Sequence, residues 1–274
     1  MKSGCVAFFF KESTLRKKAL ETNGTAAFSL YGGVELYHQG KPVCLCAGEN
    51  SSGWVRWVAG ILRRYGDWHT GYGGNPRVIF SAWEVIREAR GIVATSNNVG
   101  LPLLELKRWG LVRAPILLLS VGLEAYRSDA QSLRCRRLAN LLKHAERIVV
   151  FSEAEKRFLS QLLNLSADLL TAVPYGFHPR YFPTFVEERT IRNEVLTVGA
   201  DAQRDMELFR EWSLRHPETR IRAILSREIV ERLPAVPDSW VLENDIPLET
   251  VLARLAEASL VVIPVKENLY TAGT

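Results

Sequence analysis

The sequence predicts an α/β protein built from two domains. Short apolar runs alternate with longer amphipathic stretches along the chain, which is typical of β-α-β units around a parallel sheet. One segment rich in proline and glycine, residues 174–183, interrupts this alternation and is followed by the charged run 187–189. A second alternation then begins. We therefore expect a first domain over residues 1–178, a linker over 179–193 and a second domain over 194–274.

Each apolar run has the length of a buried strand, and each amphipathic stretch has the length of a helix. In the first domain, strands are expected over residues 5–10, 42–47, 91–95, 116–120, 147–151 and 169–173. Helices are expected between them, over residues 25–39, 54–65, 81–89, 101–109, 133–145 and 153–163. In the second domain, we expect strands over 195–198, 220–225, 239–242 and 260–263, and helices over 205–214 and 248–258.

Local signals mark several boundaries of these elements. Gly40 follows the first helix, where a left-handed C-terminal cap is favoured. Ser152 and Glu155 have the spacing of a capping box directly after an apolar strand. Asn97 and Asn98 are placed in a strand-to-helix loop. Ligands of open α/β sheets bind at that carboxyl edge, so we expect both asparagines to contact an acceptor or else to cap the helix.

Composition narrows the class of protein. Hydrophobic residues make up 47% of the chain and charged residues 24%, as in soluble globular proteins. No run approaches the ~20 apolar residues that cross a bilayer, and the first apolar run is too short for a signal peptide. The four cysteines fit neither a zinc site nor a disulfide framework, so we expect small core residues in a reducing compartment. These observations predict a cytoplasmic protein.

The net charge of +5 favours anionic partners, which include phosphorylated substrates, acidic membranes and nucleic acid. The arginines are scattered and no nucleic-acid motif is present, so nucleic acid is not expected as a partner. Residues 54–65 place tryptophans and arginines at helical spacing. Such a helix either packs its apolar stripe onto the sheet or lies on an anionic membrane, and the sequence favours packing while leaving peripheral membrane association open.

Four segments, taken in order, resemble the retaining glycosyltransferases of family 4, which have the GT-B fold of two Rossmann-like domains. Residues 144–153 (HAERIVVFSE) are similar to the family's "ADRIVVFSE" segment, and residues 173–183 to its "VPNGVD…F.P" crossover. Residues 195–205 resemble the strand and glycine turn that open the donor domain. Residues 247–267 resemble the helix and strand that lead to the "PS..E.FG" loop.

The resemblance implies transfer of a hexose from a nucleoside-diphosphate sugar, with no separate cofactor. A carbohydrate or lipid-linked acceptor is implied, and no metal is expected because no Asp-x-Asp motif is apparent. Transfer passes through an oxocarbenium-like state and leaves a diphosphate, which backbone N–H groups and a basic side chain stabilise. Gly199 and Arg204 match the diphosphate-binding positions, although Ala200 stands where the family usually has an arginine. Glu267 matches the catalytic acidic residue that contacts the donor sugar, and Gly273 the loop glycine.

Further candidates lie in the first domain. Gly24 follows the first strand, where a glycine loop can face the donor phosphates. Gly32 and Gly33 are placed inside a helix, so a packing role is preferred for them. His69 is placed in a loop over residues 67–72, either as an acceptor-site base or orienting group or as an ordinary loop histidine.

The final residues, 270–274, follow a strand and contain a glycine turn that would lead into a helix. The sequence thus predicts an incomplete second domain, cut from a longer protein, and a chain that is inactive by itself. Two alternatives remain open: a GT-B sugar-nucleotide epimerase and a non-catalytic Rossmann-like binding protein.

Overall fold

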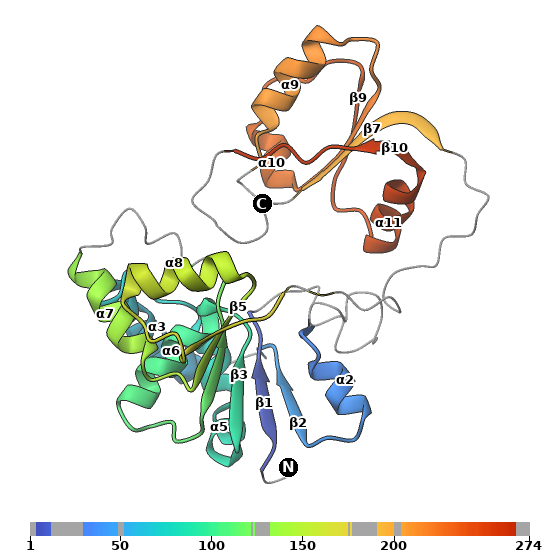
Figure 1. Cartoon of the computed structure of the whole chain (residues 1–274). Coiled ribbons are helices and arrows are strands. Elements are labelled where there is room, and N and C mark those ends of the chain that lie inside the picture. The colour runs from blue at the N-terminus through green and yellow to red at the C-terminus, as the bar shows by residue number, and fades with distance from the viewer. Residues whose placement is uncertain are drawn as a thin grey trace. The chain divides into compact units, whose positions relative to one another are not determined.

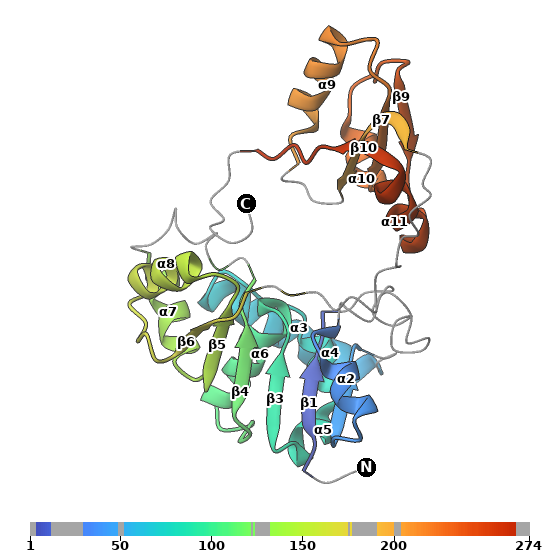
Figure 2. The same ribbon diagram turned by 45° about the vertical axis from the view of Figure 1, so that its right-hand side comes forward.

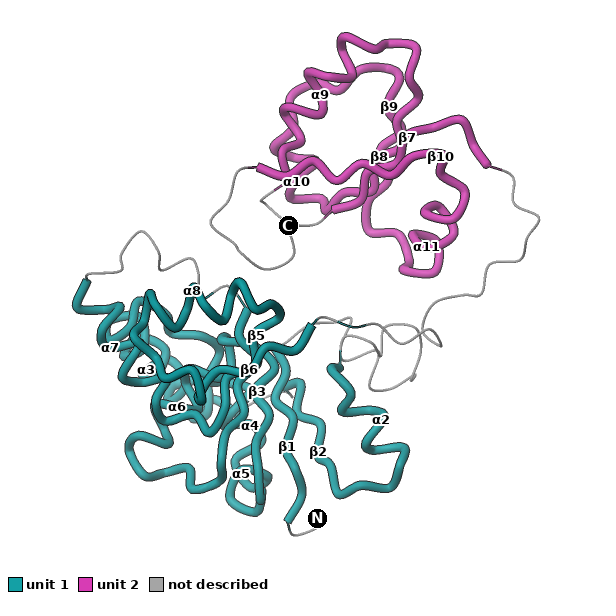
Figure 3. The backbone as a smooth tube through the Cα atoms, viewed as in Figure 1, with its two compact units in different colours: residues 1–177, 269–274 teal, residues 178–268 magenta. Residues whose placement is uncertain are grey.

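The computed structural model describes residues 4–11, 30–48, 52–121, 123, 132–174, 176, 191–199 and 204–266. The chain divides into two compact units, unit 1 with residues 1–177 and 269–274 and unit 2 with residues 178–268 (Figure 3). Each unit contains one parallel sheet with helices between its strands. The α/β fold with two Rossmann-like domains is therefore confirmed, whereas the boundaries of the linker at 179 and 193 stay a prediction.

The sheet of unit 1 has six parallel strands in the order β2-β1-β3-β4-β5-β6, and the part from β1 to β6 can be followed in Figure 2. All six expected strands of the first domain are present. Each strand end lies at the expected residue or one residue away from it. They are β1 (Val6–Phe9), β2 (Val43–Cys46), β3 (Gly91–Ala94), β4 (Ile116–Leu119), β5 (Arg147–Val150) and β6 (Leu170–Ala172). Strands β1 to β4 read as continuous apolar runs, as expected where both faces of a parallel sheet are covered.

The helices of unit 1 cover the two faces unequally. The larger core packs Phe9, Ile92 and Leu118 of the sheet against several helices, and the smaller core packs Phe8 and Phe10 against the first helix. The helices are α2 (Gly33–His38), α3 (Gly53–His69), α4 (Pro76–Ser81), α5 (Trp83–Glu88), α6 (Asn97–Arg108), α7 (Leu133–Leu142) and α8 (Glu153–Leu163) (Figure 1).

Three helix predictions are corrected. The helix expected over 81–89 is two short helices, α4 and α5, joined at Ala82. Helix α3 continues past its expected end at Tyr65 to His69, because Gly66 is a packing position rather than a break. A Cβ at Gly66 would lie 2.9 Å from the carbonyl oxygen of Tyr72, so only glycine lets the chain return this close to the helix. Helix α6 begins four residues earlier than expected, at Asn97.

Gly32 and Gly33 begin α2 rather than lie inside it, which corrects their placement. Gly32 is the N-cap residue at φ 78°, a backbone conformation that glycine adopts without strain. The packing role expected for Gly33 is confirmed, since a Cβ there would lie 2.9 Å from Leu45 of β2. Gly40 follows the helix at φ 71°, as its capping role predicted.

The capping box at the start of α8 is present in a modified form. Ser152 accepts a hydrogen bond from the backbone N–H of Glu155 at 3.0 Å, as expected. The return bond reaches one residue further back, because the Glu155 carboxylate accepts from the N–H of Phe151 at 2.9 Å. Both bonds fix the start of the helix directly after β5.

The sheet of unit 2 has four parallel strands in the order β10-β7-β8-β9. Its elements are β7 (Arg192–Gly199), α9 (Met206–Arg215), β8 (Ile221–Leu225), α10 (Arg227–Arg232), β9 (Trp240–Glu243), α11 (Leu248–Glu257) and β10 (Ala258–Val261). The sequence did not predict the short helix α10, and the last strand begins two residues earlier than expected.

Strand β10 lies at one edge of this sheet and pairs with β7. Along β10 and the segment after it, four apolar side chains are 40–57% exposed: Leu260, Val261, Ile263 and Val265. Apolar surface therefore remains open along this edge.

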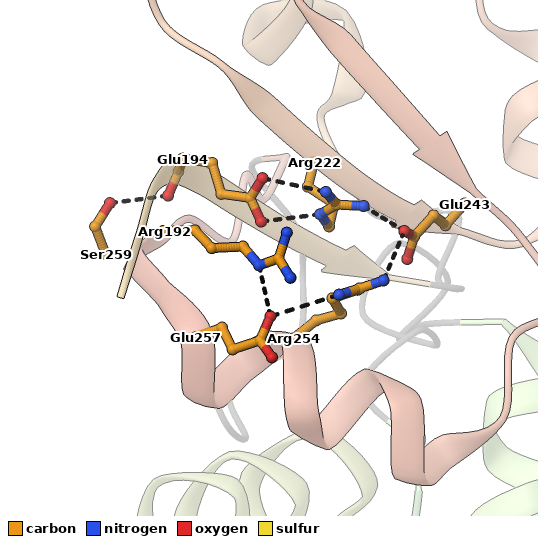
Figure 4. Close-up of polar contacts among 7 residues, drawn as sticks. All are labelled: Arg192, Glu194, Arg222, Glu243, Arg254, Glu257 and Ser259. Carbon is orange, nitrogen blue, oxygen red and sulfur yellow. Dashed lines mark hydrogen bonds and ion pairs between the residues drawn. The ribbon is translucent and has the colours of Figure 1, made fainter. Parts of the chain in front are cut away.

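An ion-pair network crosses one face of the unit 2 sheet and joins it to α11 (Figure 4). At its centre, Arg222 donates two hydrogen bonds to Glu194, of 2.9 and 3.3 Å, and a third to Glu243. Its side chain is 11% exposed, and the hydrogen bond to Glu194 raises the pKa of its guanidinium against the opposing effect of burial. The network continues to α11 and back to β7 through Arg254, Glu257 and Arg192.

In the part of the chain that the structure describes, no helix is both long enough and apolar enough to cross a membrane.

Candidate functional site

Two of the predicted donor-binding residues meet at the carboxyl edge of the unit 2 sheet. Strand β7 ends at Gly199, and Arg204 lies just before α9 with its side chain against that glycine. A Cβ at position 199 would lie 2.8 Å from Nε and 2.9 Å from Cγ of Arg204. The absence of a side chain at Gly199 therefore lets the arginine lie across the end of the strand.

The backbone holds Arg204 in this position from both sides. Arg204 forms an antiparallel bridge with Val265, in the segment that follows β10. The next residue, Asp205, donates its N–H to the carbonyl oxygen of Pro264 at 3.1 Å. Its carboxylate accepts from the N–H of Leu208 at 3.1 Å and so caps α9. Asp205 is thus used in capping the helix rather than in an ion pair with Arg204.

The Arg204 guanidinium has unused hydrogen-bonding capacity. Its Nε is buried and has no hydrogen-bond partner among the described residues. A buried donor without a partner is unfavourable by ~1–3 kcal/mol, and by more when the group is charged, so such sites are suited to receiving a ligand. An anion at this edge of the sheet would accept from Arg204, which is the chemistry predicted for a diphosphate.

A second basic side chain near this edge, Arg227, is already paired. Arg227 begins α10 and contacts Asp245 at 3.1 Å, with both side chains more than 60% exposed. An exposed pair of this kind contributes ~0–1 kcal/mol, so it can exchange for a ligand. The loop before α10 does lie close to the glycine turn, because the N–H of Ser226 donates to the carbonyl oxygen of Gly199 at 3.3 Å.

The remaining predicted donor-side residues, Glu267, Gly273 and Gly24, lie outside the described residues. Lys266 is the last described residue before Glu267. Their assigned roles stay predictions.

On unit 1, Asn97 and Asn98 lie in the first turn of α6 and not in the loop before it, which corrects their placement. Ser96 is the N-cap residue, so neither asparagine takes the cap position. Asn97 donates to the carbonyl oxygen of Val121 at 2.5 Å, and the amide of Asn98 lies 3.4 Å from the hydroxyl of Tyr72. The contact with Val121 links the ends of β3 and β4.

Unpartnered polar atoms gather at this carboxyl edge of the unit 1 sheet. The side-chain oxygens of Ser96, Asn97, Asn98 and Ser120 are buried and have no hydrogen-bond partner among the described residues. Ser120 is fully buried at the end of β4. Four such oxygens together are uncommon in a folded protein, and they form a set of acceptors that ligand hydroxyl groups could satisfy.

Sequence reasoning did not single out Ser120. The sequence did contain a signal for it, because Ser120 is the first polar residue after an apolar strand. Asn97 and Asn98 have a similar place, a few residues after β3. The rule that ligands bind beyond the carboxyl ends of parallel strands would have selected it.

His69 is not a loop residue, which corrects its expected placement. It is the last residue of α3, is 7% exposed, and its Nδ1 lies 2.6 Å from the carboxylate of Glu105 on α6. Arg108 contacts the same carboxylate at 3.1 Å and donates to the hydroxyl of Tyr65 at 2.5 Å. This buried cluster joins α3 to α6, and its geometry does not favour the acceptor-side role, which stays a prediction.

A hollow of about 480 Å³ lies beside the edge strand β2. Its walls are the end of β2, the start of α3 and helices α4 and α5, with the aromatic side chains of Trp54, Phe80 and Trp83.

Two thiols lie close together on β2 and just before β1. The Sγ atoms of Cys5 and Cys44 lie 2.6 Å apart, and burial raises the pKa of the Cys5 thiol to about 12. Within the described residues, no cluster of three or more His, Cys, Asp or Glu side chains could hold a metal ion.

Comparison with known proteins identifies the fold. No protein-family model matches the sequence, and no curated protein matches it. Among solved structures, sucrose-phosphate synthase from Thermosynechococcus elongatus aligns over 98% of this chain and 77% of its own, with a TM-score of 0.67 and 13% sequence identity. The chain has the GT-B fold.

Two further glycosyltransferases align more loosely with this GT-B chain. The spinosyn rhamnosyltransferase SpnG covers 94% of this chain and 74% of its own, at 15% identity and a TM-score of 0.43. The glycosyltransferase SnogD from Streptomyces nogalater covers 96% and 82%, at 14% identity and a TM-score of 0.38. The likeness to sucrose-phosphate synthase alone shows the fold.

Proposed function

We propose that this protein is a retaining glycosyltransferase of the family 4 type, which transfers a hexose from a nucleoside-diphosphate sugar to a carbohydrate or lipid-linked acceptor. The observation that carries the proposal is the buried Nε of Arg204, which lies against Gly199 at the carboxyl edge of the unit 2 sheet and has no hydrogen-bond partner in the described part of the chain. The GT-B fold supports it, as do the four segments that resemble the family in order.

In this proposal, unit 2 stabilises the charge of the leaving diphosphate. Arg204 donates to a diphosphate oxygen, and Gly199 keeps the space beside the strand end open for it. The start of α9 adds backbone N–H groups and the positive end of its dipole. Glu267 is assigned to contact with the donor sugar, and Gly273 and Gly24 are assigned to donor binding. These three assignments rest on resemblance and position in the sequence.

Unit 1 receives the acceptor in this proposal. The buried oxygens of Ser96, Asn97, Asn98 and Ser120 accept hydrogen bonds from acceptor hydroxyl groups. They orient the acceptor, and the attacking hydroxyl is thereby held in position, which lowers the entropy lost on reaching the transition state.

Nucleotide binding to this chain tests the donor site. UDP, GDP, ADP and dTDP are titrated by calorimetry into the chain and into Arg204→Gln. A charge-assisted hydrogen bond contributes ~1.5–3 kcal/mol, so Kd for the preferred diphosphate should rise about 10- to 150-fold in the variant. Arg215→Gln is the matched control, since Arg215 is an exposed arginine of α9 with a weak pairing to Glu211 at 3.9 Å.

The results separate the alternatives. An unchanged Kd in Arg204→Gln, or equal losses in both variants, would contradict the donor site. When a sugar nucleotide is supplied with candidate acceptors, a transferase releases free nucleoside diphosphate, whereas an epimerase interconverts the sugar nucleotide without releasing it. Sugar transfer by residues 1–274 would contradict the expectation that this chain is inactive by itself.

A further inference from the structure

Helix α3 exposes a stripe of large apolar side chains. Trp54, Trp57, Ile61 and Trp68 recur at spacings of three, four and seven residues and are 65%, 69%, 48% and 60% exposed. We call these four residues the α3 stripe. Three tryptophans in one exposed line are unusual, because large apolar surfaces that monomers leave open usually mark interaction sites.

The α3 stripe takes no part in the buried hydrophobic cores of the described residues. The opposite side of the helix supplies the core contacts, where Val55, Ala59 and Leu62 are 6%, 5% and 4% exposed. The helix is therefore apolar over more of its circumference than its packing against α4, α6 and α7 requires. The sequence favoured a helix that packs its apolar stripe onto the sheet, but α3 packs its buried side mainly against α4, α6 and α7 and leaves the α3 stripe exposed.

Cationic side chains accompany the stripe. Arg56, Arg63 and Arg64 are exposed on the same helix, and none forms an ion pair with a carboxylate in the described ranges. The only acidic residue of α3 is Asp67, and its carboxylate already accepts from the N–H of Gly73 at 2.7 Å. The positive charge of this surface is therefore not neutralised locally.

Helix α7 extends this cationic surface. The guanidinium of Arg137 lies 4.8 Å from the centre of the Trp68 ring, and Arg134 and Arg136 are exposed beside it. The first turn of α7 contains no acidic residue. Cations at a helix N-terminus are unfavourable because they face the positive end of the dipole, so an anionic partner here would be stabilising.

We propose that the α3 stripe and the arginines of α3 and α7 bind the surface of an anionic membrane. Tryptophan is favoured at the boundary between headgroups and acyl chains, and exposed arginines attract anionic headgroups. A second copy of this chain fits less well, because a twofold interface would bring the same arginines face to face. The inference does not depend on the proposed sugar transfer.

Vesicle sedimentation tests the proposal with the whole chain. Sucrose-loaded vesicles of phosphatidylcholine alone, or of phosphatidylcholine and phosphatidylglycerol in equal amounts, are mixed with protein at low and high NaCl concentration. We expect binding to the anionic vesicles that falls with added salt, and little binding to phosphatidylcholine alone. The double variant Trp57→Ala/Trp68→Ala should lower the partition coefficient at least tenfold, whereas Trp212→Ala on α9 should not.

Charge is tested by a matched pair of triple variants. Arg56→Gln/Arg63→Gln/Arg64→Gln removes three charges from the surface, and Arg87→Gln/Arg215→Gln/Arg232→Gln removes three from exposed pairs elsewhere. An arginine near an anionic surface contributes ~1 kcal/mol, so each substitution in the first set should weaken binding about fivefold. Circular dichroism verifies folding of every variant.

Three results would overturn the proposal. These are equal binding to neutral and anionic vesicles, equal losses in the two triple variants, and no binding at low salt. Sedimentation velocity without vesicles distinguishes a membrane from a second copy of this chain as the partner of this surface. Self-association that Trp57→Ala/Trp68→Ala abolishes would identify the second copy as the partner instead.

Discussion

Replacing Arg222 by methionine should destabilise unit 2 strongly, because the arginine is the centre of a largely buried network. Its side chain is 11% exposed, and it contacts the carboxylates of Glu194 and Glu243, which are 11% and 18% exposed. Removing one partner of a buried ion pair costs ~3–5 kcal/mol, since the opposite charge is left buried. Arg254 still contacts Glu243 at 3.5 Å, so we expect the lower value, about 3 kcal/mol.

The assay must report on unit 2 alone. Hydrogen exchange of peptides from β8 and β9, followed by mass spectrometry at increasing urea concentration, gives the free energy of unfolding of this sheet. With a slope of ~1.5–2 kcal/mol per molar urea, a loss of about 3 kcal/mol lowers the midpoint by about 1.5–2 M. Arg232→Met is the control, because its pair with Glu228 is about 70% exposed and should contribute less than ~1 kcal/mol.

A third variant separates stranded charge from lost packing. In Glu194→Leu/Arg222→Met/Glu243→Leu no buried charge is left without a partner, so stability should recover most of the loss. The reasoning is refuted if Arg222→Met unfolds within ~0.5 kcal/mol of the Arg232→Met control, or if the triple variant is less stable than Arg222→Met.

Three other predictions concern unit 1. Gly74→Ala should lower the free energy of unfolding by several kcal/mol, because Gly74 has φ 63° and a Cβ there would lie 2.3 Å from the carbonyl oxygen of Asn98; chemical denaturation measures it, and a loss below ~1 kcal/mol would contradict the close approach. Glu105→Gln should cost about 3 kcal/mol in the same assay, because the carboxylate is 2% exposed and contacts the guanidinium of Arg108 and the imidazole of His69, and an unchanged midpoint would argue against this buried contact. The pKa of the Cys5 thiol is raised to about 12 in the folded protein, so the folded protein holds this proton more tightly than the unfolded chain does. This contribution to stability should be lost as pH rises from 9 towards 12, by up to ~1.4 kcal/mol per pH unit. The test is a comparison of the slope of stability against pH in Cys5→Ala, which should be shallower over that window, and parallel slopes would contradict the prediction.

The strands could be predicted because burial on both faces leaves a plain mark on the sequence. Runs such as those of β3 and β4 are apolar throughout and end at the first polar residue. Helix ends were harder to predict, because a glycine can either end a helix or allow another segment to pack closely against it. Gly66 looks like a break in α3, yet it is required where Tyr72 approaches, and that approach depends on the tertiary structure.

The site was predictable to a similar degree. Gly199 and Arg204 are five residues apart, so a local motif could place them together, and the structure brings them into contact. His69 and Glu105 are separated by 36 residues on two helices, and no local pattern announces their pairing. Histidine in a sequence suggests acid–base chemistry by its type alone, whereas its burial and partner are set by how α3 packs on α6.

The open edge of the unit 2 sheet affects how this protein can be handled in solution. Strand β10 carries Leu260 and Val261 at 55% and 40% exposure, and the segment after it carries Ile263 and Val265 at 57% and 45%. An exposed, apolar edge strand is a template for adding strands from other molecules, and proteins usually protect such edges with charges or proline. We therefore expect concentrated samples to aggregate through this edge, at a rate that rises more steeply than in proportion to the protein concentration. Val261→Lys would place a charge on this edge strand and delay the rise in turbidity that reports aggregation, without changing Gly199 or Arg204.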